Sequence, residues 1–147
     1  MEYRERLHER CLRFGVSVVT LLQRLMDSQR PALRLRQLEK SATSIGANVS
    51  EARSAQSRLD FISKFEIALK EARETDYWLR LLKATETQLE PRIGTLIGEC
   101  GQITAILVTS VKTAKKNGGI QEERLQRKEQ NAETGKQNVK AGSREQN

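Results

Sequence analysis

Residue types that bind metals or act as nucleophiles are sparse in this chain of 147 residues, which contains one histidine and two cysteines. His8 and Cys11 stand three residues apart, so they would share one face of a helix, as a pair of metal ligands does. Zinc sites normally use three or four protein ligands, and the sequence contains no companion pair. We therefore expect no metal site. A single histidine also excludes multi-histidine sites and leaves histidine-based catalysis without a partner.

The other candidate chemical groups are carboxylates and glycines. Three carboxylates fall close together in the sequence: Glu71, Glu74 and Asp76. Di-iron sites in helical bundles need a Glu-x-x-His pattern from two helices, which is absent here, so a solvated acidic face is the expectation. The glycines at 94, 98 and 101 are not followed by the Lys-Ser/Thr of a phosphate-binding loop. We predict that the protein is not an enzyme and binds no cofactor.

Positive charge is the remaining chemical feature. The chain has 26 Lys and Arg against 19 Asp and Glu, a formal net charge of +7. Such a charge has two interpretations, an ordinary solvated surface or a face that binds a polyanion. The candidate nucleic-acid-binding residues are Arg53, Arg58, Lys64, Lys112, Lys115 and Lys116. Aromatic residues make up only 4% of the chain, which argues against base stacking and favours salt-sensitive contacts to phosphates.

A second polar group is predicted in the middle of the chain. Asn48 and Glu51 lie beside an apolar stripe, on neighbouring turns of one helical face. If they are partly buried they need hydrogen-bond partners, which Lys70 or Arg73 of the following helix are placed to supply. We interpret this as a structural polar cluster that sets the register of the helices. The alternative is a ligand or partner site.

Four amphipathic helices must position these residues. Apolar residues recur in steps of three and four over four segments, which indicates one buried face per helix. The stripes are Leu7, Cys11, Phe14, Val18, Leu21 and Leu25; Leu35, Leu38, Ala42, Ile45, Val49 and Ala52; Phe61, Phe65, Ala68, Ala72, Thr75, Leu79 and Leu82; Ile93, Leu96, Ile97, Cys100, Ile103, Leu107, Val108 and Val111. Breaks near Pro31, Ser57 and Pro91 separate the segments.

These segments predict an all-α fold, an antiparallel up-down four-helix bundle over residues 1–117. The second helix is expected over 31–55, with small residues around Gly46 that allow close approach of another helix. The third helix is expected after Ser57 and the fourth over 92–116. In this topology the loop at 53–58 and the cations at 112–116 share one end of the bundle, where they would form one basic patch.

The last part of the chain differs in composition. Residues 118–147 are mostly polar and contain only three sizeable hydrophobic residues. Such a segment buries too little apolar area to offset its ordering entropy, so we expect a disordered C-terminal tail, with a short helix around 121–130 as an alternative. We find no signal region and no stretch that approaches membrane-spanning length, and Cys11 and Cys100 both fall on apolar stripes. We expect a cytoplasmic protein with no membrane partner.

Two runs of sequence resemble a known family. The runs are residues 42–52, ATSIGANVSEA, and residues 60–75, DFISKFEIALKEARET, the second followed by YWLRLL at 77–82. They resemble the four-helix-bundle proteins encoded within intervening sequences of bacterial 23S ribosomal RNA genes, over about residues 7–117. Ala52 stands where many members carry glycine. Relatives of that family include the accessory variability proteins of diversity-generating retroelements.

The resemblance implies an antiparallel bundle that assembles into a ring-shaped homopentamer. In the retroelement branch it implies a basic ring surface that contacts reverse transcriptase and nucleic acid. Our first hypothesis is therefore a homo-oligomeric adaptor or scaffold with weakly specific affinity for RNA or DNA. The second hypothesis is a structural or protein-binding oligomer without a nucleic-acid partner.

Overall fold

The backbone of this chain forms four long helices. The computed structural model describes residues 2–26, 32–86, 88 and 90–142. Helix α1 spans Glu2–Met26, α2 spans Ala32–Ala52, α3 spans Arg58–Thr85 and α4 spans Glu90–Gly142. The described residues contain no strand, which confirms the all-α prediction. Pro31, expected in the first turn of the second helix, lies outside the described residues.

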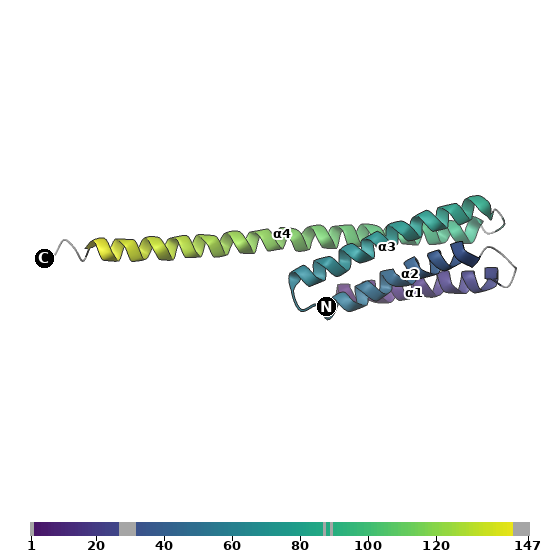
Figure 1. Cartoon of the computed structure of the whole chain (residues 1–147), viewed down its shortest axis with the longest axis horizontal. Coiled ribbons are helices and arrows are strands. Elements are labelled where there is room, and N and C mark those ends of the chain that lie inside the picture. The colour runs from purple at the N-terminus through teal and green to yellow at the C-terminus, as the bar shows by residue number, and fades with distance from the viewer. Residues whose placement is uncertain (1, 27–31, 87, 89, 143–147) are drawn as a thin grey trace. The chain divides into compact units, whose positions relative to one another are not determined.

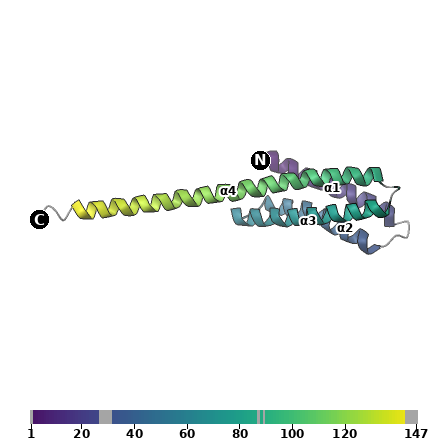
Figure 2. The ribbon, with the colours of Figure 1, turned by 90° about the horizontal axis from the view of Figure 1, so that it is seen from above.

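The helices alternate in direction and pack side by side. In both views α1 and α2 form one antiparallel pair, and α3 returns alongside α2 before the chain turns into α4 (Figures 1 and 2). The predicted stripes form the core, and most of their members are less than 9% exposed. Phe61, Leu82, Ile97 and Val108 are the half-buried exceptions, while Ile62 and Leu22 are buried in addition. The antiparallel four-helix bundle is therefore confirmed.

The turn between α2 and α3 has clear local causes. At the end of α2, the N–H groups of Arg53, Ser54 and Ala55 each donate to the carbonyl three residues before them. This tightened last turn ends the helix at Ala52, three residues earlier than predicted. Ser57 then caps α3, because its Oγ accepts a hydrogen bond from the N–H of Asp60 at 3.0 Å. The Asp60 carboxylate accepts a hydrogen bond from the N–H of Gln56, the residue before the cap, at 3.2 Å.

Helix α4 extends well past its predicted end near Lys116. It continues through Gly142, although no side chain described between Lys112 and Lys128 is buried. The composition explains this difference. The stretch is rich in Glu, Gln, Lys and Arg and contains no proline, so a helical backbone is favoured even without a core. The chain divides into two compact units, residues 1–112 and residues 113–147.

One prediction about hydropathy was wrong. The segment Pro91–Gly119 is long and apolar enough to cross a membrane by length and composition, with a mean hydropathy of 1.3 in its most apolar window. Core helices of bundles pass the same test. Here Ile93, Cys100 and Leu107 of this segment are fully buried against the other helices, which accounts for their apolar character.

Gly46 lies where α1 and α2 approach each other. A Cβ atom added at Gly46 would lie 3.6 Å from the Cβ of Cys11 and 3.7 Å from its backbone carbonyl, which is ordinary van der Waals contact. We expect Gly46→Ala to raise the free energy of unfolding by about 0.5–1 kcal/mol, because alanine favours the helical backbone and fits the space. Urea denaturation followed by circular dichroism measures this change.

Gly98→Ala is the matched control for this experiment. Gly98 is exposed on α4 and a Cβ there meets nothing within 4 Å. Both substitutions should therefore give a similar gain from helix propensity alone. A loss of stability in Gly46→Ala, together with a gain in Gly98→Ala, would mean that α1 and α2 pack more closely than the structure shows.

Candidate nucleic-acid interface

Three of the six predicted phosphate-binding residues surround the turn between α2 and α3. Arg53 follows the last residue of α2 and Arg58 is the first residue of α3, and both side chains are exposed. Lys64 lies two turns further along α3 and forms an ion pair with Glu51, with 2.5 Å between Nζ and Oε2. The hydrogen bond that Lys64 donates to the Glu51 carboxylate raises the pKa of Lys64. Lys64 is thus charged but already engaged by a carboxylate.

Lys112 lies at the same end of the bundle. The thiol of Cys100 donates to the carbonyl oxygen of Ala72 at 3.3 Å, which fixes the register between α4 and α3. The two helices are antiparallel, so a step forward along α4 matches an equal step back along α3. Lys112, twelve residues after Cys100, is therefore level with Asp60, twelve residues before Ala72. Lys112 is exposed and, by this register, level with the first turn of α3. Exposed Lys115 and Lys116 belong to the second unit of the chain.

The predicted polar cluster has different partners from those expected. The Asn48 amide donates to the carbonyl oxygen of Ser44 at 2.9 Å, within its own helix. Glu51 pairs with Lys64 across the α2–α3 turn. Lys70 and Arg73 are exposed on α3 and contribute to neither contact. Asn48 and Glu51 therefore act locally, one along α2 and the other at the turn, because α3 presents Lys64 closest to Glu51.

A hydroxyl pair links α2 and α3 inside the core instead. Ser41 and Thr75 are 1% and 0% exposed. Thr75 Oγ1 lies 3.0 Å from Ser41 Oγ and 2.8 Å from the carbonyl oxygen of Glu71. Ser41 Oγ donates to the carbonyl oxygen of Leu38 at 3.2 Å. Both hydroxyls are thus satisfied, which removes the cost of burying them. Thr75 stood on a predicted apolar stripe, but nothing in sequence pointed to Ser41.

The strongest polar contact between α1 and α4 was also missed from sequence. Arg10 donates two hydrogen bonds to the Glu99 carboxylate, from Nε to Oε1 at 2.5 Å and from Nη2 to Oε2 at 2.8 Å. Arg10 Nη2 also donates to Gln102 Oε1. The hydrogen bond from Arg10 lowers the pKa of Glu99. This bidentate, partly buried pair is the type of ion pair that fixes the geometry of two helices, and residues 89 positions apart carry no sequence signal for it.

Four of the groups considered for chemistry are buried or make contacts within the bundle. Cys11 and Cys100 are buried free thiols, and burial raises the pKa of each to about 12. Glu74 accepts a hydrogen bond from Trp78 Nε1 at 3.2 Å, and Asp76 pairs with Arg80 at 2.7 Å. Within the described part of the chain, no group of three His, Cys, Asp or Glu residues is placed to hold a metal ion.

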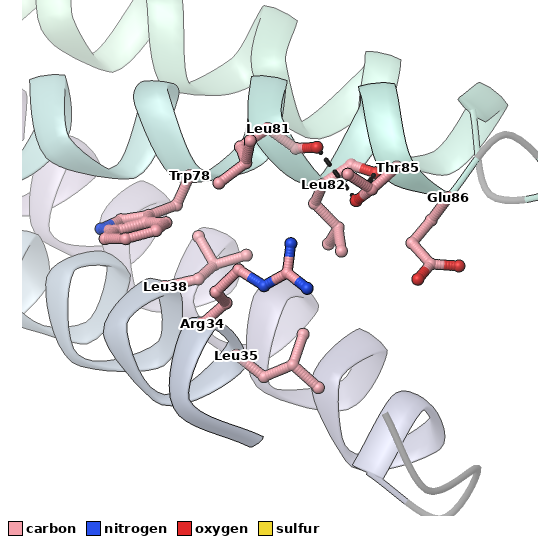
Figure 3. Close-up of a pocket in the computed structure, with 8 residues that line it drawn as sticks. All are labelled: Arg34, Leu35, Leu38, Trp78, Leu81, Leu82, Thr85 and Glu86. Atoms are coloured by element: carbon pink, nitrogen blue, oxygen red, sulfur yellow. Dashed lines mark hydrogen bonds between the residues drawn. The ribbon is translucent and has the colours of Figure 1, made fainter. Parts of the chain in front are cut away.

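A small cavity lies between the start of α2 and the end of α3. Leu35 and Leu38 of α2 face Trp78 and Leu82 of α3, and the Arg34 guanidinium lies across the opening (Figure 3). The cavity measures about 30 Å³. The half-buried indole of Trp78 lines this cavity, while the neighbouring Tyr77 is exposed.

A family model accounts for most of the chain. The model of the 23S rRNA-intervening sequence protein family matches residues 6–109. The chain belongs to this family. The crystal structure of a protein of unknown function from Bacteroides thetaiotaomicron, assigned to the S23 ribosomal protein family, is similar at 40% identity and a TM-score of 0.69. The match covers 72% of this chain and 98% of that protein. No match was found among curated proteins.

The 23S rRNA-intervening sequence match separates two groups of residues. It includes the Arg10–Glu99 pair, the Ser41–Thr75 pair and the whole α2–α3 turn. Lys112, Lys115 and Lys116 lie beyond it. The internal contacts of the bundle and the cations of the turn therefore fall within the family segment, whereas the cations of α4 do not.

Proposed function

We propose that this protein is a non-enzymatic, homo-oligomeric adaptor that binds nucleic acid through the phosphate backbone. The observation that supports this most directly is the gathering of exposed Arg53, Arg58 and Lys112 at one end of the bundle. Lysine and arginine at such a site displace counterions from phosphates, so the affinity is electrostatic and carries little sequence preference. RNA and DNA are both expected ligands. Oligomerisation multiplies the sites and raises the avidity.

Fluorescence anisotropy with a labelled DNA duplex and a structured RNA, between about 50 and 200 mM salt, tests this proposal. The triple variant Arg53→Ala, Arg58→Ala, Lys112→Ala should bind at least about tenfold more weakly at the low salt concentration. Each lost phosphate contact should reduce the salt slope for the duplex by about 0.9, hence by about 2.7 for three contacts. A second variant, Lys115→Ala with Lys116→Ala, measures how much the lysines of the second unit contribute to nucleic-acid affinity.

The matched control removes the same charge elsewhere. Arg36, Lys40 and Arg92 are exposed cations outside the α2–α3 turn. Their triple alanine variant changes the net charge equally, and its affinity should fall by less than about threefold. Equal losses in both triple variants would show that only net charge matters. If the wild type does not bind at the lowest salt concentration, the nucleic-acid part of the proposal is wrong.

A purely protein-binding oligomer is the second candidate, and one observation favours it. Leu12 and Val16 on the outer face of α1 are 59% and 57% exposed, which is typical of a surface that another protein covers. The family resemblance implies a ring of five copies, and in the retroelement branch a reverse transcriptase partner. Light scattering of the wild type gives the number of subunits directly.

A further inference from the structure

A groove between α1 and α4 combines two cations with three hydroxyl groups, and no carboxylate lines it among the described residues. The α1 side carries Ser17, Thr20 and Arg24, which share one helical face because they are three and four residues apart. The α4 side carries Arg92 and Thr95. The groove measures about 420 Å³, which is within the range of about 300–1,000 Å³ for small-molecule sites. We call it the α1–α4 groove.

The two arginines of the α1–α4 groove are not neutralised by the protein. Three other arginines of the bundle are paired with carboxylates: Arg10 with Glu99, Arg13 with Glu9, and Arg80 with Asp76. Arg24 and Arg92, by contrast, make no ion pair with any residue that the structure describes. Both are exposed. Two guanidinium groups on the two sides of one groove create a positive potential that attracts an anion.

The rest of the lining adds a hydrogen-bond donor and an apolar surface. The hydroxyls of Ser17 and Thr95 donate to backbone carbonyl oxygens of their own helices, at 2.9 Å and 3.0 Å. Thr20 makes no hydrogen bond with the described residues, so its hydroxyl is available to donate to a ligand oxygen. The side chains of Leu21 and Leu96 supply the apolar part of the lining.

We propose that the α1–α4 groove binds a small phosphate monoester through Arg24, Arg92 and the hydroxyl of Thr20. A phosphate monoester carries about −1.5 to −2 charges at pH 7, which matches two guanidinium groups, whereas a carboxylate or a phosphodiester carries a single charge. The planar guanidinium fork donates parallel hydrogen bonds to phosphate oxygens. The apolar lining receives the organic part of the ligand.

This site goes beyond the proposed function because it is separate from the nucleic-acid interface. Arg24 lies in the last turn of α1 and Arg92 is the third residue of α4. The end of α1 and the start of α4 lie at the opposite end of the bundle from the α2–α3 turn (Figure 1). The two sites share no residue, so the loss of one should leave the other intact.

Isothermal titration calorimetry of the full chain at low salt tests the site with three matched probes. Adenosine 5′-monophosphate is the monoester, 3′,5′-cyclic AMP is the diester with the same base and sugar, and adenosine lacks the phosphate. Cyclic AMP should bind at least about fivefold more weakly than the monoester, and adenosine should give no measurable binding. Inorganic phosphate should compete with the monoester. The double variant Arg24→Ala, Arg92→Ala should bind the monoester at least about tenfold more weakly.

Two further double variants separate the geometry of the site from its charge. Arg36→Ala with Lys40→Ala removes the same charge from exposed positions of α2, and its affinity for the monoester should stay within about twofold of the wild type. Arg24→Lys with Arg92→Lys keeps the charge but loses the fork, so its affinity should fall by about threefold or more. All four side chains are exposed, so the circular dichroism spectra should not change.

Several results would overturn this inference. They are a wild type that binds adenosine 5′-monophosphate no more tightly than adenosine, equal affinities for the monoester and cyclic AMP, and equal losses in the Arg24, Arg92 and Arg36, Lys40 alanine variants. An unchanged affinity in Arg24→Ala, Arg92→Ala would also overturn it.

The outcomes separate this site from the proposed function. The triple variant Arg53→Ala, Arg58→Ala, Lys112→Ala should bind the monoester like the wild type, and Arg24→Ala with Arg92→Ala should bind the DNA duplex like the wild type. If the second variant lost as much duplex affinity as the first, the α1–α4 groove would belong to the nucleic-acid interface, which would overturn the small-molecule ligand.

Discussion

Replacing Leu79 by alanine should lower the free energy of unfolding by about 3–5 kcal/mol. Leu79 is fully buried on α3. By the register that Cys100 and Ala72 set, it lies level with Ile93 of α4, which is also fully buried. Truncation removes apolar atoms from the core and leaves a cavity that rigid neighbouring helices fill only in part. A domain with a total stability of about 5–15 kcal/mol would lose a large share of it.

Urea denaturation monitored by circular dichroism at 222 nm measures this loss, with Leu59→Ala as the control. Leu59 is the same residue type on the same helix but is 78% exposed, so its truncation should change stability by less than about 0.5 kcal/mol. A loss below about 1 kcal/mol for Leu79→Ala would contradict the packing of α3 against α4 described above.

The second large effect is a loss of stability at alkaline pH that arises from the two buried thiols. Burial raises the pKa of Cys11 and of Cys100 from 9.0 to about 12. Between these values the unfolded chain releases the thiol protons while the folded chain retains them. The folded state therefore binds more protons, and the free energy of unfolding falls as pH rises through this window. The loss approaches about 1.4 kcal/mol per pH unit for each thiol.

Denaturation midpoints between about pH 8 and pH 11 test this linkage. Lysines and tyrosines also titrate in this range, so stability is expected to depend on pH even without the thiols. The wild type is therefore compared with the double variant Cys11→Ala, Cys100→Ala. The variant should start less stable, because each truncation leaves a small cavity, but its stability should decline less steeply with pH. Parallel declines in the two proteins would show that the thiols ionise without unfolding and are more accessible than their burial indicates.

The local features of the fold were predictable from sequence because their causes are local. Ser57 was expected at the start of the third helix, and its hydroxyl caps α3 because Asp60 follows it at the third helical position. The end of α4 was not predicted. Its polar continuation lacks core residues, but its helix-forming composition and the absence of proline allow the backbone to remain helical through Gly142.

The polar contacts between helices, in contrast, were not predictable from sequence. Asn48 is half-buried on α2 but Glu51 is exposed, and their contacts are with Ser44 and Lys64 rather than with Lys70 or Arg73. Whether Glu51 meets Lys64 or Lys70 depends on a difference of less than two helical turns in the register of α3. The Arg10–Glu99 and Ser41–Thr75 contacts join residues far apart in sequence, so no spacing rule predicts them.

The sequence by itself determined the number of helices, their alternation and the residues of the core, because apolar periodicity and turn signals act over a few residues. It also determined the net charge, the scarcity of catalytic groups and the two runs that identify the family. Only the tertiary structure decided which polar groups pair, that Lys112 lies level with the α2–α3 turn, and that Leu12 and Val16 of α1 are exposed. Those features depend on the register and rotation of whole helices, which the summed packing of all four determines.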